Sequence, residues 1–228
     1  YVGAAAKAEY DAQTLGATTV SPKTDLTGLE YSVGVGYEVM PGLKLGAAWR
    51  MASINAAVNY AYLVGALPIS ANLTDLKDTK YNGYRLGAQY QVSDSWGLGV
   101  SYRSKMEFVA DGTFSATRGD TGASVNTGTN TASVATQLPE QVSIGTSYKL
   151  GTNWATALEY VWTHYGKIAS IDVTGTATTG ALADITTDWA NQPNVRAGVA
   201  YTGLSDWTIR GGYVYTSKVT PANRAGST

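Results

Sequence analysis

Apolar and polar residues alternate strictly along several stretches of the chain, beginning with residues 29–39, which read LEYSVGVGYEV. Every odd position there is apolar and every even position is small or charged, which is the pattern of a β-strand with one face in an apolar environment. The alternation recurs at residues 84–92, 96–102, 142–150, 154–162, 195–201 and 207–215. Together with a strand opening at Leu43 and a weaker one at residues 1–12, the pattern predicts about nine strands.

A longer repeat groups these strands into hairpins. Six residues separate a tyrosine from the next apolar strand start in four places: Tyr37 and Leu43, Tyr90 and Trp96, Tyr148 and Trp154, Tyr201 and Trp207. Each pair is joined by a tight turn, whereas the return connections at residues 118–137 and 175–193 are long and polar. Short turns at one end and long loops at the other are typical of bacterial outer-membrane barrels, whose short turns are periplasmic.

Aromatic residues recur at both ends of the same apolar face. Six residues separate Trp96 from Tyr102, as they do Trp154 from Tyr160 and Trp207 from Tyr213. At roughly 3.3 Å per residue the two rings lie about 20 Å apart, close to the height of about 25 Å for the apolar band of a membrane barrel. We therefore predict an aromatic girdle made of Tyr37, Tyr90, Trp96, Tyr102, Tyr148, Trp154, Tyr160, Tyr201, Trp207 and Tyr213.

The opposite face of these strands carries charged residues with glycines between them. The lumen-facing candidates are Arg85, Arg103, Glu159, Arg196 and Arg210. The arginines suit a carboxylate head group, although pairing with acidic residues across a wet lumen is the simpler interpretation.

These patterns predict an all-β fold, an antiparallel transmembrane β-barrel, with a single domain over residues 1–228. A soluble β-sandwich also alternates apolar and polar residues. However, its strands are usually about five or six residues long, and it rarely repeats Tyr and Trp at both ends of an apolar face. The transmembrane barrel is therefore favoured.

The composition supports this fold and narrows the function. Charged residues make up 14% of the chain, below the roughly 25% of a soluble domain. With 16 Tyr and 6 Trp against 2 Phe, the aromatic set favours rings with a polar edge, which suit a membrane boundary.

A formal net charge of -1 without a basic cluster argues against a nucleic-acid partner. The absence of cysteine excludes disulfides and thiolate sites.

Three stretches resemble the later portion of a transporter of the FadL family. Residues 81–114 contain the hairpin ending in SYRS, and residues 138–168 contain an LP entry into a strand, a short turn and a strand ending in aromatics. Residues 188–224 contain DW followed by RAGVAY and WTIRGGYVY. The order and spacing of these motifs carry the resemblance, whereas SKVTP at residues 217–221 departs from the family's usual two prolines.

The resemblance implies a barrel of roughly fourteen strands with an N-terminal segment plugging the lumen. We therefore expect the chain to be incomplete at both ends. The implied function is passive uptake of long-chain fatty acids or other hydrophobic compounds across the outer membrane. The resemblance also implies that outer loops catch the substrate, which leaves laterally or through the lumen after the plug rearranges. Residues 66–76 mix apolar and polar residues and are predicted to form either part of a capture surface or a short cover over the barrel mouth. The implied partners are outer-membrane lipids, including lipopolysaccharide, and a hydrophobic small molecule.

Two other functions remain open at this point. A general diffusion porin would conduct ions steadily, and a structural or adhesive surface barrel would present loops such as residues 119–134. The oligomeric state is not indicated by the sequence.

The sequence argues against an enzyme. The single histidine, His164, stands at an outer strand end without an assignable Ser or Asp partner. One histidine without cysteine leaves only carboxylates for a metal, and their spacing is not that of a calcium loop. We expect no catalytic residues, no metal site and no cofactor.

Overall fold

Antiparallel β-strands make up almost the whole of the computed structural model, which describes residues 2–9, 12–15, 18–128 and 130–221. Nine of its strands coincide with the predicted ones: β1 (Val2–Glu9), β4 (Lys23–Met40), β5 (Leu43–Val64), β6 (Leu67–Gln91), β7 (Trp96–Arg103), β10 (Gln141–Leu150), β11 (Trp154–Thr163), β16 (Gln192–Tyr201) and β17 (Ile209–Thr216). In the described part of the chain, no helix is both long and apolar enough to cross a bilayer.

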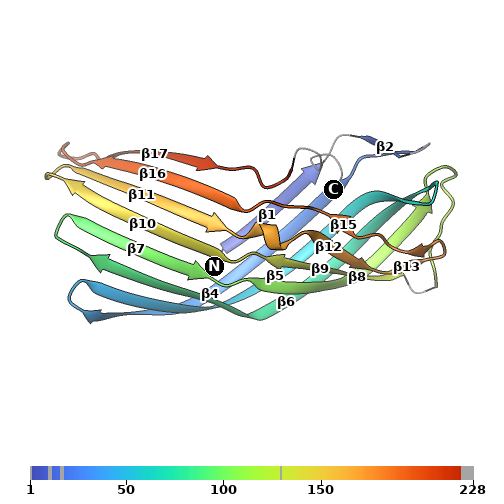
Figure 1. Cartoon of the computed structure of the whole chain (residues 1–228), viewed down its shortest axis with the longest axis horizontal. Helices are drawn as coiled ribbons and strands as arrows, with labels where there is room; N and C mark the ends of the chain where they lie inside the picture. Colours follow the sequence, from blue (N-terminus) through green and yellow to red (C-terminus); the bar gives the residue numbers. More distant parts are fainter. Residues whose placement is uncertain (1, 10–11, 16–17, 129, 222–228) are drawn as a thin grey trace.

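The nine strands pair in the order β1, β4, β5, β6, β7, β10, β11, β16 and β17, each antiparallel to its neighbour. Short turns close the hairpins at the left end in Figure 1. The all-β antiparallel fold is therefore confirmed.

The wall continues far beyond the predicted strands. At the other end of the molecule it is built by β8 (Met106–Arg118), β9 (Thr131–Leu138), β12 (Ser170–Thr174) and β15 (Ile185–Thr186), which follow β6 in the same sheet (Figure 1). Two small ladders are formed by β2 (Gln13–Leu15) with β3 (Thr18–Val20) and by β13 (Thr176–Ala177) with β14 (Gly180–Ala181). One turn of 3-10 helix, η1 (Tyr165–Lys167), separates β11 from β12. We call this second half of the wall the extension.

Several predicted boundaries were wrong. Residues 66–76, expected to be a loop, belong mostly to β6, and the last third of the expected loop at 118–137 belongs to β9. Trp207 lies in the turn before β17 and not in a strand. Of the weak first strand, residues 1, 10 and 11 are outside the described residues.

Strand β6 pairs with different partners along its length. Its second half pairs with β7, from Arg85 onward, and its first half pairs with β8, up to Lys77. Between these two ladders the backbones of β6 and β8 are not paired. The register of β6 also shifts beside Asp75, whose φ of 56° lies in the left-handed region, as expected of a β-bulge.

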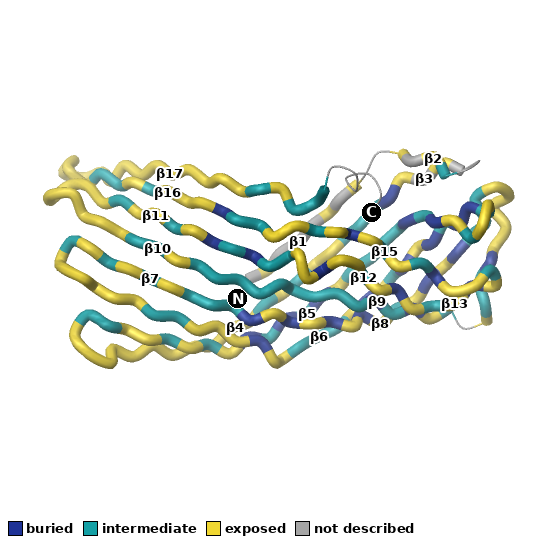
Figure 2. The backbone as a smooth tube through the Cα atoms, in the orientation of Figure 1, coloured by how far each residue is buried: buried dark blue, intermediate teal, exposed yellow. Residues whose placement is uncertain are grey.

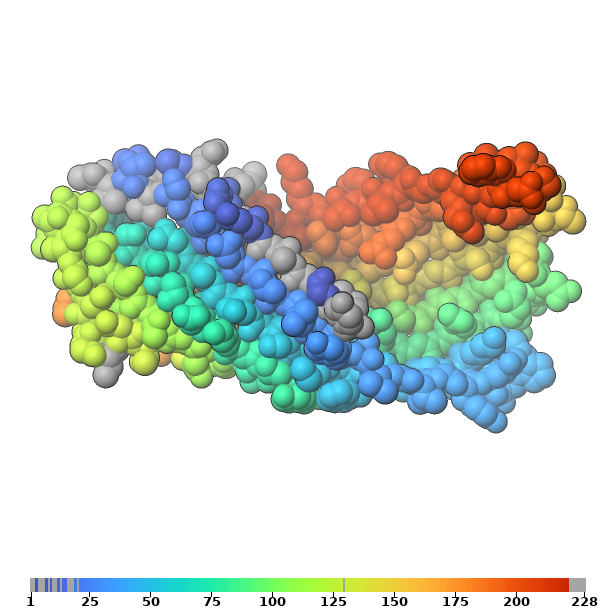
Figure 3. Space-filling view, turned by 180° about the vertical axis from the view of Figure 1, so that it is seen from behind, coloured from blue at the N-terminus to red at the C-terminus, as the bar shows by residue number. Residues whose placement is uncertain are grey.

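One ion pair identifies the concave face of the sheet. Glu30 on β4 and Arg103 on β7 approach to 2.6 Å although β5 and β6 lie between their strands. Neighbouring strands are about 4.8 Å apart, so only side chains on the inside of a curved wall reach across two strands. Figure 3 shows this curved wall from behind, with the N-terminal strands in blue along one side and β17 in red along the other.

The two halves of the wall differ in what the concave face carries. In the extension it is packed with apolar side chains, among them Ile69, Leu73, Phe108 and Phe114, all at most 3% exposed. In the other half, apolar side chains lie on the convex face and are exposed, for example Val35 and Leu158. Figure 2 shows this contrast as dark blue segments gathered in the extension. The first half thus presents an apolar outside, and the extension an apolar inside.

Candidate functional site on the concave face

Glycine and other short residues line the concave face of the first half. The register places Gly36 of β4 beside Gly46 of β5, and Gly46 beside Gly87 of β6. Further along the wall, Gly99 of β7 lies beside Gly145 of β10. These residues border a hollow of about 1360 Å³.

Most of these glycines are not required by the sheet itself. A Cβ atom at Gly36, Gly46 or Gly87 would come no closer than 3.5 Å to any neighbour, which is ordinary van der Waals contact. Gly83 is different, because its Cβ would lie 2.5 Å from Sδ of Met106 and 3.0 Å from Cβ of Arg50. The short residues therefore keep the hollow wide, whereas Gly83 is needed for packing.

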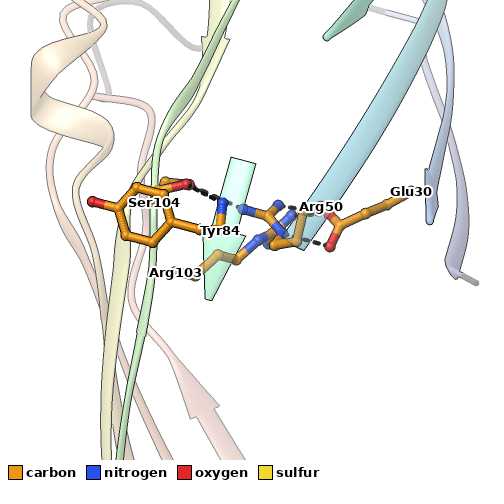
Figure 4. A network of polar contacts seen from close by, with 5 residues as sticks. All are labelled: Glu30, Arg50, Tyr84, Arg103 and Ser104. Carbon is orange, nitrogen blue, oxygen red and sulfur yellow. Dashed lines mark hydrogen bonds and ion pairs between the residues drawn. The ribbon is translucent and has the colours of Figure 1, made fainter. Parts of the chain in front are cut away.

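A charged network lies on the concave face at the boundary between the first half of the wall and the extension. Arg50 is fully buried and donates Nε and Nη2 to the two carboxylate oxygens of Glu30, both at 2.7 Å. Arg50 Nη1 also donates to the carbonyl of Ser104 at 3.1 Å. Arg103 donates Nη2 to Glu30 Oε2 at 2.6 Å. Figure 4 shows the two guanidinium groups converging on the one carboxylate.

Ser104 ties this network to the strand pairing. Its amide donates to the carbonyl of Tyr84 at 3.0 Å, and its hydroxyl accepts the amide of Tyr84 at 2.9 Å (Figure 4). These bonds end the β6–β7 ladder where β7 gives way to β8. The network is therefore part of the junction between the two halves of the wall.

The predicted lumen-facing residues all lie on the concave face, but they do not form one cluster. Arg85 and Arg103 are cross-strand partners near the network. Glu159 pairs with Arg196 at 3.1 Å, both well exposed. Arg210 lies on β17, and its neighbour across the ladder is Ala200. Their role in a lumen stays a prediction.

The sequence pattern did not single out Glu30 and Arg50, the two most buried charged residues of the network. The signal was present, since Lys44, Gly46, Ala48 and Arg50 are the even, inward positions of β5. Alternation within a single strand does not predict the curvature of the sheet, and it is this curvature that brings Glu30 close to Arg103.

Basic side chains outnumber acidic ones on this concave face. The basic residues are Lys44, Arg50, Arg85, Arg103, Lys149, Arg196 and Arg210, and the acidic ones are Glu30, Glu38 and Glu159. Among the described residues, Arg85, Lys149 and Arg210 have no ion-pair partner. Nε of Arg103 is buried and finds no hydrogen-bond partner in the part of the chain that the structure describes. This face therefore favours an anion or an electron-rich group in the hollow.

Nine of the ten predicted girdle residues lie on the convex face of a strand. The tenth, Trp207, lies in the turn before β17. Near the short turns, the register sets Trp96 beside Tyr148 and Trp154 beside Tyr201, with ring centroids of the second pair 4.6 Å apart. At the other end, Tyr102 contacts Tyr84 at a ring distance of 5.9 Å. Positions on this face not predicted as girdle include Trp49, Tyr84 and Trp162. Contact of these rings with lipid stays a prediction.

A second polar cluster lies on the convex face of the first half, at the end that adjoins the extension. Glu140, between β9 and β10, accepts a hydrogen bond from the hydroxyl of Tyr102 at 3.0 Å and lies 2.8 Å from Nδ1 of His164. The ring of His164 packs on Trp162 at 4.7 Å. His164 therefore joins β11 to the β9–β10 junction. No group of three or more metal-binding side chains is found among the described residues.

Comparison with known proteins gives one family. The sequence profile described as "Outer membrane protein transport protein (OMPP1/FadL/TodX)" matches residues 1–227. No curated protein sequence matches the chain.

Solved structures share the fold at low sequence identity. A Pseudomonas aeruginosa FadL homologue is 15% identical with a TM-score of 0.71, over 91% of this chain and 52% of its own. The Ralstonia pickettii toluene transporter TbuX is 15% identical with a TM-score of 0.71, over 96% and 66%. The Pseudomonas putida toluene transporter TodX is 19% identical with a TM-score of 0.67, over 89% and 58%. The chain thus spans between about half and two thirds of these relatives.

Proposed function

Because the chain belongs to the OMPP1/FadL/TodX family of outer-membrane transport proteins, we propose that the complete protein carries hydrophobic compounds passively across the outer membrane. The observation that supports this proposal most directly is the hollow on the concave face of the first half. It is about 1360 Å³, and half of its lining is glycine, alanine and serine, with Glu38, Lys44, Arg85 and Glu159 among the rest. Such a wall offers an elongated apolar molecule a smooth surface without bulky obstruction.

Two further features support membrane transport. The convex face of the same strands is apolar and aromatic, as required of a wall that faces lipid. The Pseudomonas putida and Ralstonia pickettii relatives are described as toluene transporters, which extends the substrate class from fatty acids to small aromatic hydrocarbons.

Within this class we favour long-chain fatty acids. Arg85 and Arg103 stand side by side on the concave face, and the only carboxylate that Arg103 reaches among the described residues is Glu30, which it shares with Arg50. A carboxylate bound by a guanidinium gains strong, directional hydrogen bonds. An uncharged hydrocarbon cannot form these charge-assisted hydrogen bonds, so the basic excess favours a substrate with an acidic head.

The test is uptake by the complete parent protein in a host lacking its own importer, together with single-channel conductance. Labelled long-chain fatty acid and labelled toluene are supplied separately. Fatty-acid uptake with little steady conductance supports the proposal, and toluene uptake alone would restrict the substrate to hydrocarbons. Large steady conductance without uptake would indicate a porin, and neither signal would favour a surface-contact role.

Two variants test the head-group assignment. Arg85→Gln is expected to lower fatty-acid uptake about tenfold, because one charge-assisted contact contributes about 1.5–3 kcal/mol, and to leave toluene uptake unchanged. Arg118→Gln, an exposed arginine of the extension paired with Asp120 at 2.8 Å, is the matched control. Equal loss of both substrates in Arg85→Gln would contradict a head-group role.

A further inference from the structure

Residues 170–187 form a loop whose two ends meet at one point. The amides of Thr187 and Asp188 both donate to the carbonyl of Ala169 at 3.0 Å, and the hydroxyl of Thr187 donates to the carbonyl of Ile168 at 2.6 Å. A loop with its ends held together in this way can turn about that point as one body. We call residues 170–187 the flap, which contains β12, β13 and β15 in Figure 1.

Hydrogen bonds within the flap give it a structure of its own. Strand β12 pairs with β15, and β13 pairs with β14. The amide of Leu182 donates to the carbonyl of Gly175 at 3.0 Å, and the amide of Val173 donates to the carboxylate of Asp184 at 2.8 Å. Because these bonds join parts of the flap to each other, they do not break when the flap moves as a unit.

Apolar side chains of the flap fill part of the inside of the extension. Val173, Ala177 and Leu182 are at most 6% exposed and belong to the same apolar cluster as Tyr60 on β5. Gly175 permits this packing, because a Cβ atom there would lie 2.7 Å from Cδ1 of Leu182. The flap therefore occupies space that an apolar molecule inside the extension would need.

Few polar contacts hold the flap against the rest of the wall. Its ladder with β9 is three residues long. The other contacts include a hydrogen bond from the hydroxyl of Tyr60 to the carbonyl of Ala183 at 3.0 Å, and one from the amide of Thr178 to the carbonyl of Val125 at 2.8 Å. The carboxylates of the flap accept hydrogen bonds from within it, and no salt bridge joins it to the wall in the described part of the chain.

The closed position also leaves two hydroxyl groups buried without a hydrogen-bond partner among the described residues. They belong to Thr179 in the flap and to Tyr62 on β5, whose ring stacks on that of Tyr60 at 5.7 Å. A buried polar group without a hydrogen bond costs free energy, and exposure to water removes this cost. The flap is therefore held closed mainly by apolar packing, which another apolar molecule can replace.

We propose that the flap is an entry gate, which swings about Ala169 and Thr187 to open the apolar inside of the extension. This inference rests on the proposed function: with the short turns facing the periplasm, a compound meets the extension before it reaches the hollow. Opening exposes apolar surface to water, which is unfavourable. A hydrophobic compound covers that surface in place of Val173 and Leu182, so it stabilises the open flap, whereas a polar solute does not.

A disulfide between the flap and β9 tests the gate in the complete parent protein. Ser133 and Thr174 are directly opposed in the short ladder, where Cα atoms lie about 4.5–5.5 Å apart, a spacing that a disulfide spans. The flap pair is Ser133→Cys with Thr174→Cys. The matched control, Thr74→Cys with Thr113→Cys, joins opposed residues of β6 and β8 outside the flap. Uptake of fatty acid and of toluene is measured in a host lacking its own importer, after oxidation and again after reduction.

We expect oxidation of the flap pair to lower uptake by about tenfold or more, because a locked gate limits the rate of entry, and reduction to restore it. The control pair should import equally in both states. Unchanged uptake by a fully oxidised flap pair overturns the proposal.

Labelling of a buried cysteine measures opening without transport. Ala177 in the flap and Ala52 on β5 are both at most 3% exposed. In the purified complete protein, a thiol reagent should label Ala177→Cys about tenfold faster than Ala52→Cys, because the flap opens without global unfolding. Tyr60→Phe removes the bond to Ala183 and should speed the labelling of Ala177→Cys about fivefold, whereas Tyr62→Phe should not. Equal labelling of the two buried cysteines overturns the gate.

The two measurements separate the gate from the proposed function. If the unchanged protein imports neither compound, the proposed function is contradicted, while the labelling rates still decide whether the flap opens. Uptake that persists in the oxidised flap pair contradicts the gate and leaves the proposed function intact.

Discussion

Glu30 on β4 and Arg103 on β7 are joined by a hydrogen-bonded ion pair of 2.6 Å across two intervening strands. The same carboxylate binds Arg50, which is fully buried. One acidic residue therefore neutralises two arginines at the junction of the two halves of the wall. Several expected outcomes follow from this arrangement and from the faces of the strands.

Glu30→Ala should destabilise the protein strongly. The substitution leaves Arg50 buried without an anion, and breaking a buried pair by removing one partner costs about 3–5 kcal/mol. The measurement is the unfolding free energy in lipid vesicles. Glu159→Ala, which breaks the exposed pair with Arg196, is the control and should cost about 0–1 kcal/mol. Similar losses in the two variants would argue against a structural role for the network.

Gly83→Ala should destabilise, whereas Gly87→Ala should not. A methyl group at Gly83 collides with the buried Met106 and with Arg50, while at Gly87 the nearest atom is 3.5 Å away. Overpacking of this kind costs about 1–3 kcal/mol. The measurement is the midpoint temperature of unfolding of each of the two variants. It is read from the temperature at which the band of folded protein disappears from a gel. An unchanged midpoint for Gly83→Ala would mean that Met106 moves aside freely.

Leu158→Arg should impair membrane assembly more than Ala157→Arg. The two residues are neighbours on β11, but Leu158 is on the convex face and Ala157 lines the hollow on the concave face. Arginine on the lipid face of a barrel costs about 2–4 kcal/mol near the bilayer midplane. The fraction of folded protein recovered in vesicles measures the difference. If Ala157→Arg proves the more harmful, the faces have been assigned the wrong way round.

Acid should weaken the contact between β6 and β8. Partial burial alone would raise the pKa of Asp78, but hydrogen bonds from Lys80 and from the amides of Val109 and Thr79 outweigh it and leave the pKa below its usual range. A lowered folded-state pKa contributes stability that is present above the unfolded value, about 3.9, and is lost as the pH falls through the folded value.

Asp78→Asn provides the comparison for this pH dependence. The unchanged protein should exceed the variant in thermal stability at about pH 6, and the difference should shrink below about pH 3.5 as the Asp78 carboxylate becomes protonated. A difference that is constant between these two pH values would mean that the charge of Asp78 does not matter.

Cysteine labelling tests which end faces the cell exterior. The chain has no cysteine of its own, so a single substitution gives an unambiguous signal. Gly128→Cys, beyond β8, should react with a membrane-impermeant reagent in intact cells, and Asp94→Cys, in the turn between β6 and β7, should not. The opposite result would invert the barrel in the membrane.

Strand alternation sufficed for the first half because apolar side chains cover one face there, and the other face borders the hollow and carries many small residues. In the extension the same rule was obscured by a bulge. Ile69, Ala71 and Leu73 alternate, but the extra residue beside Asp75 shifts the phase, so Leu76 faces inward out of step. Read without the bulge, the segment loses its period and resembles a loop.

The candidate site was predictable only in part, for a related reason. Arg85, Arg103, Glu159, Arg196 and Arg210 follow from alternation within single strands. The link from Glu30 to Arg103 depends on curvature over four strands, which no local pattern contains. The cluster of Glu140, Tyr102 and His164 likewise joins three strand ends that are far apart in sequence.

The length of the β5–β6 hairpin has a consequence for biogenesis. The hairpin extends from Leu43 through the tip at Gly65 to Gln91, with register shifts after Arg50 and Ala56, so its two strands serve both the first half and the extension. The polar convex side of the extension has to pass the bilayer when the protein is inserted. We therefore expect the tip at Gly65 to be translocated before the neighbouring strands close around the hairpin.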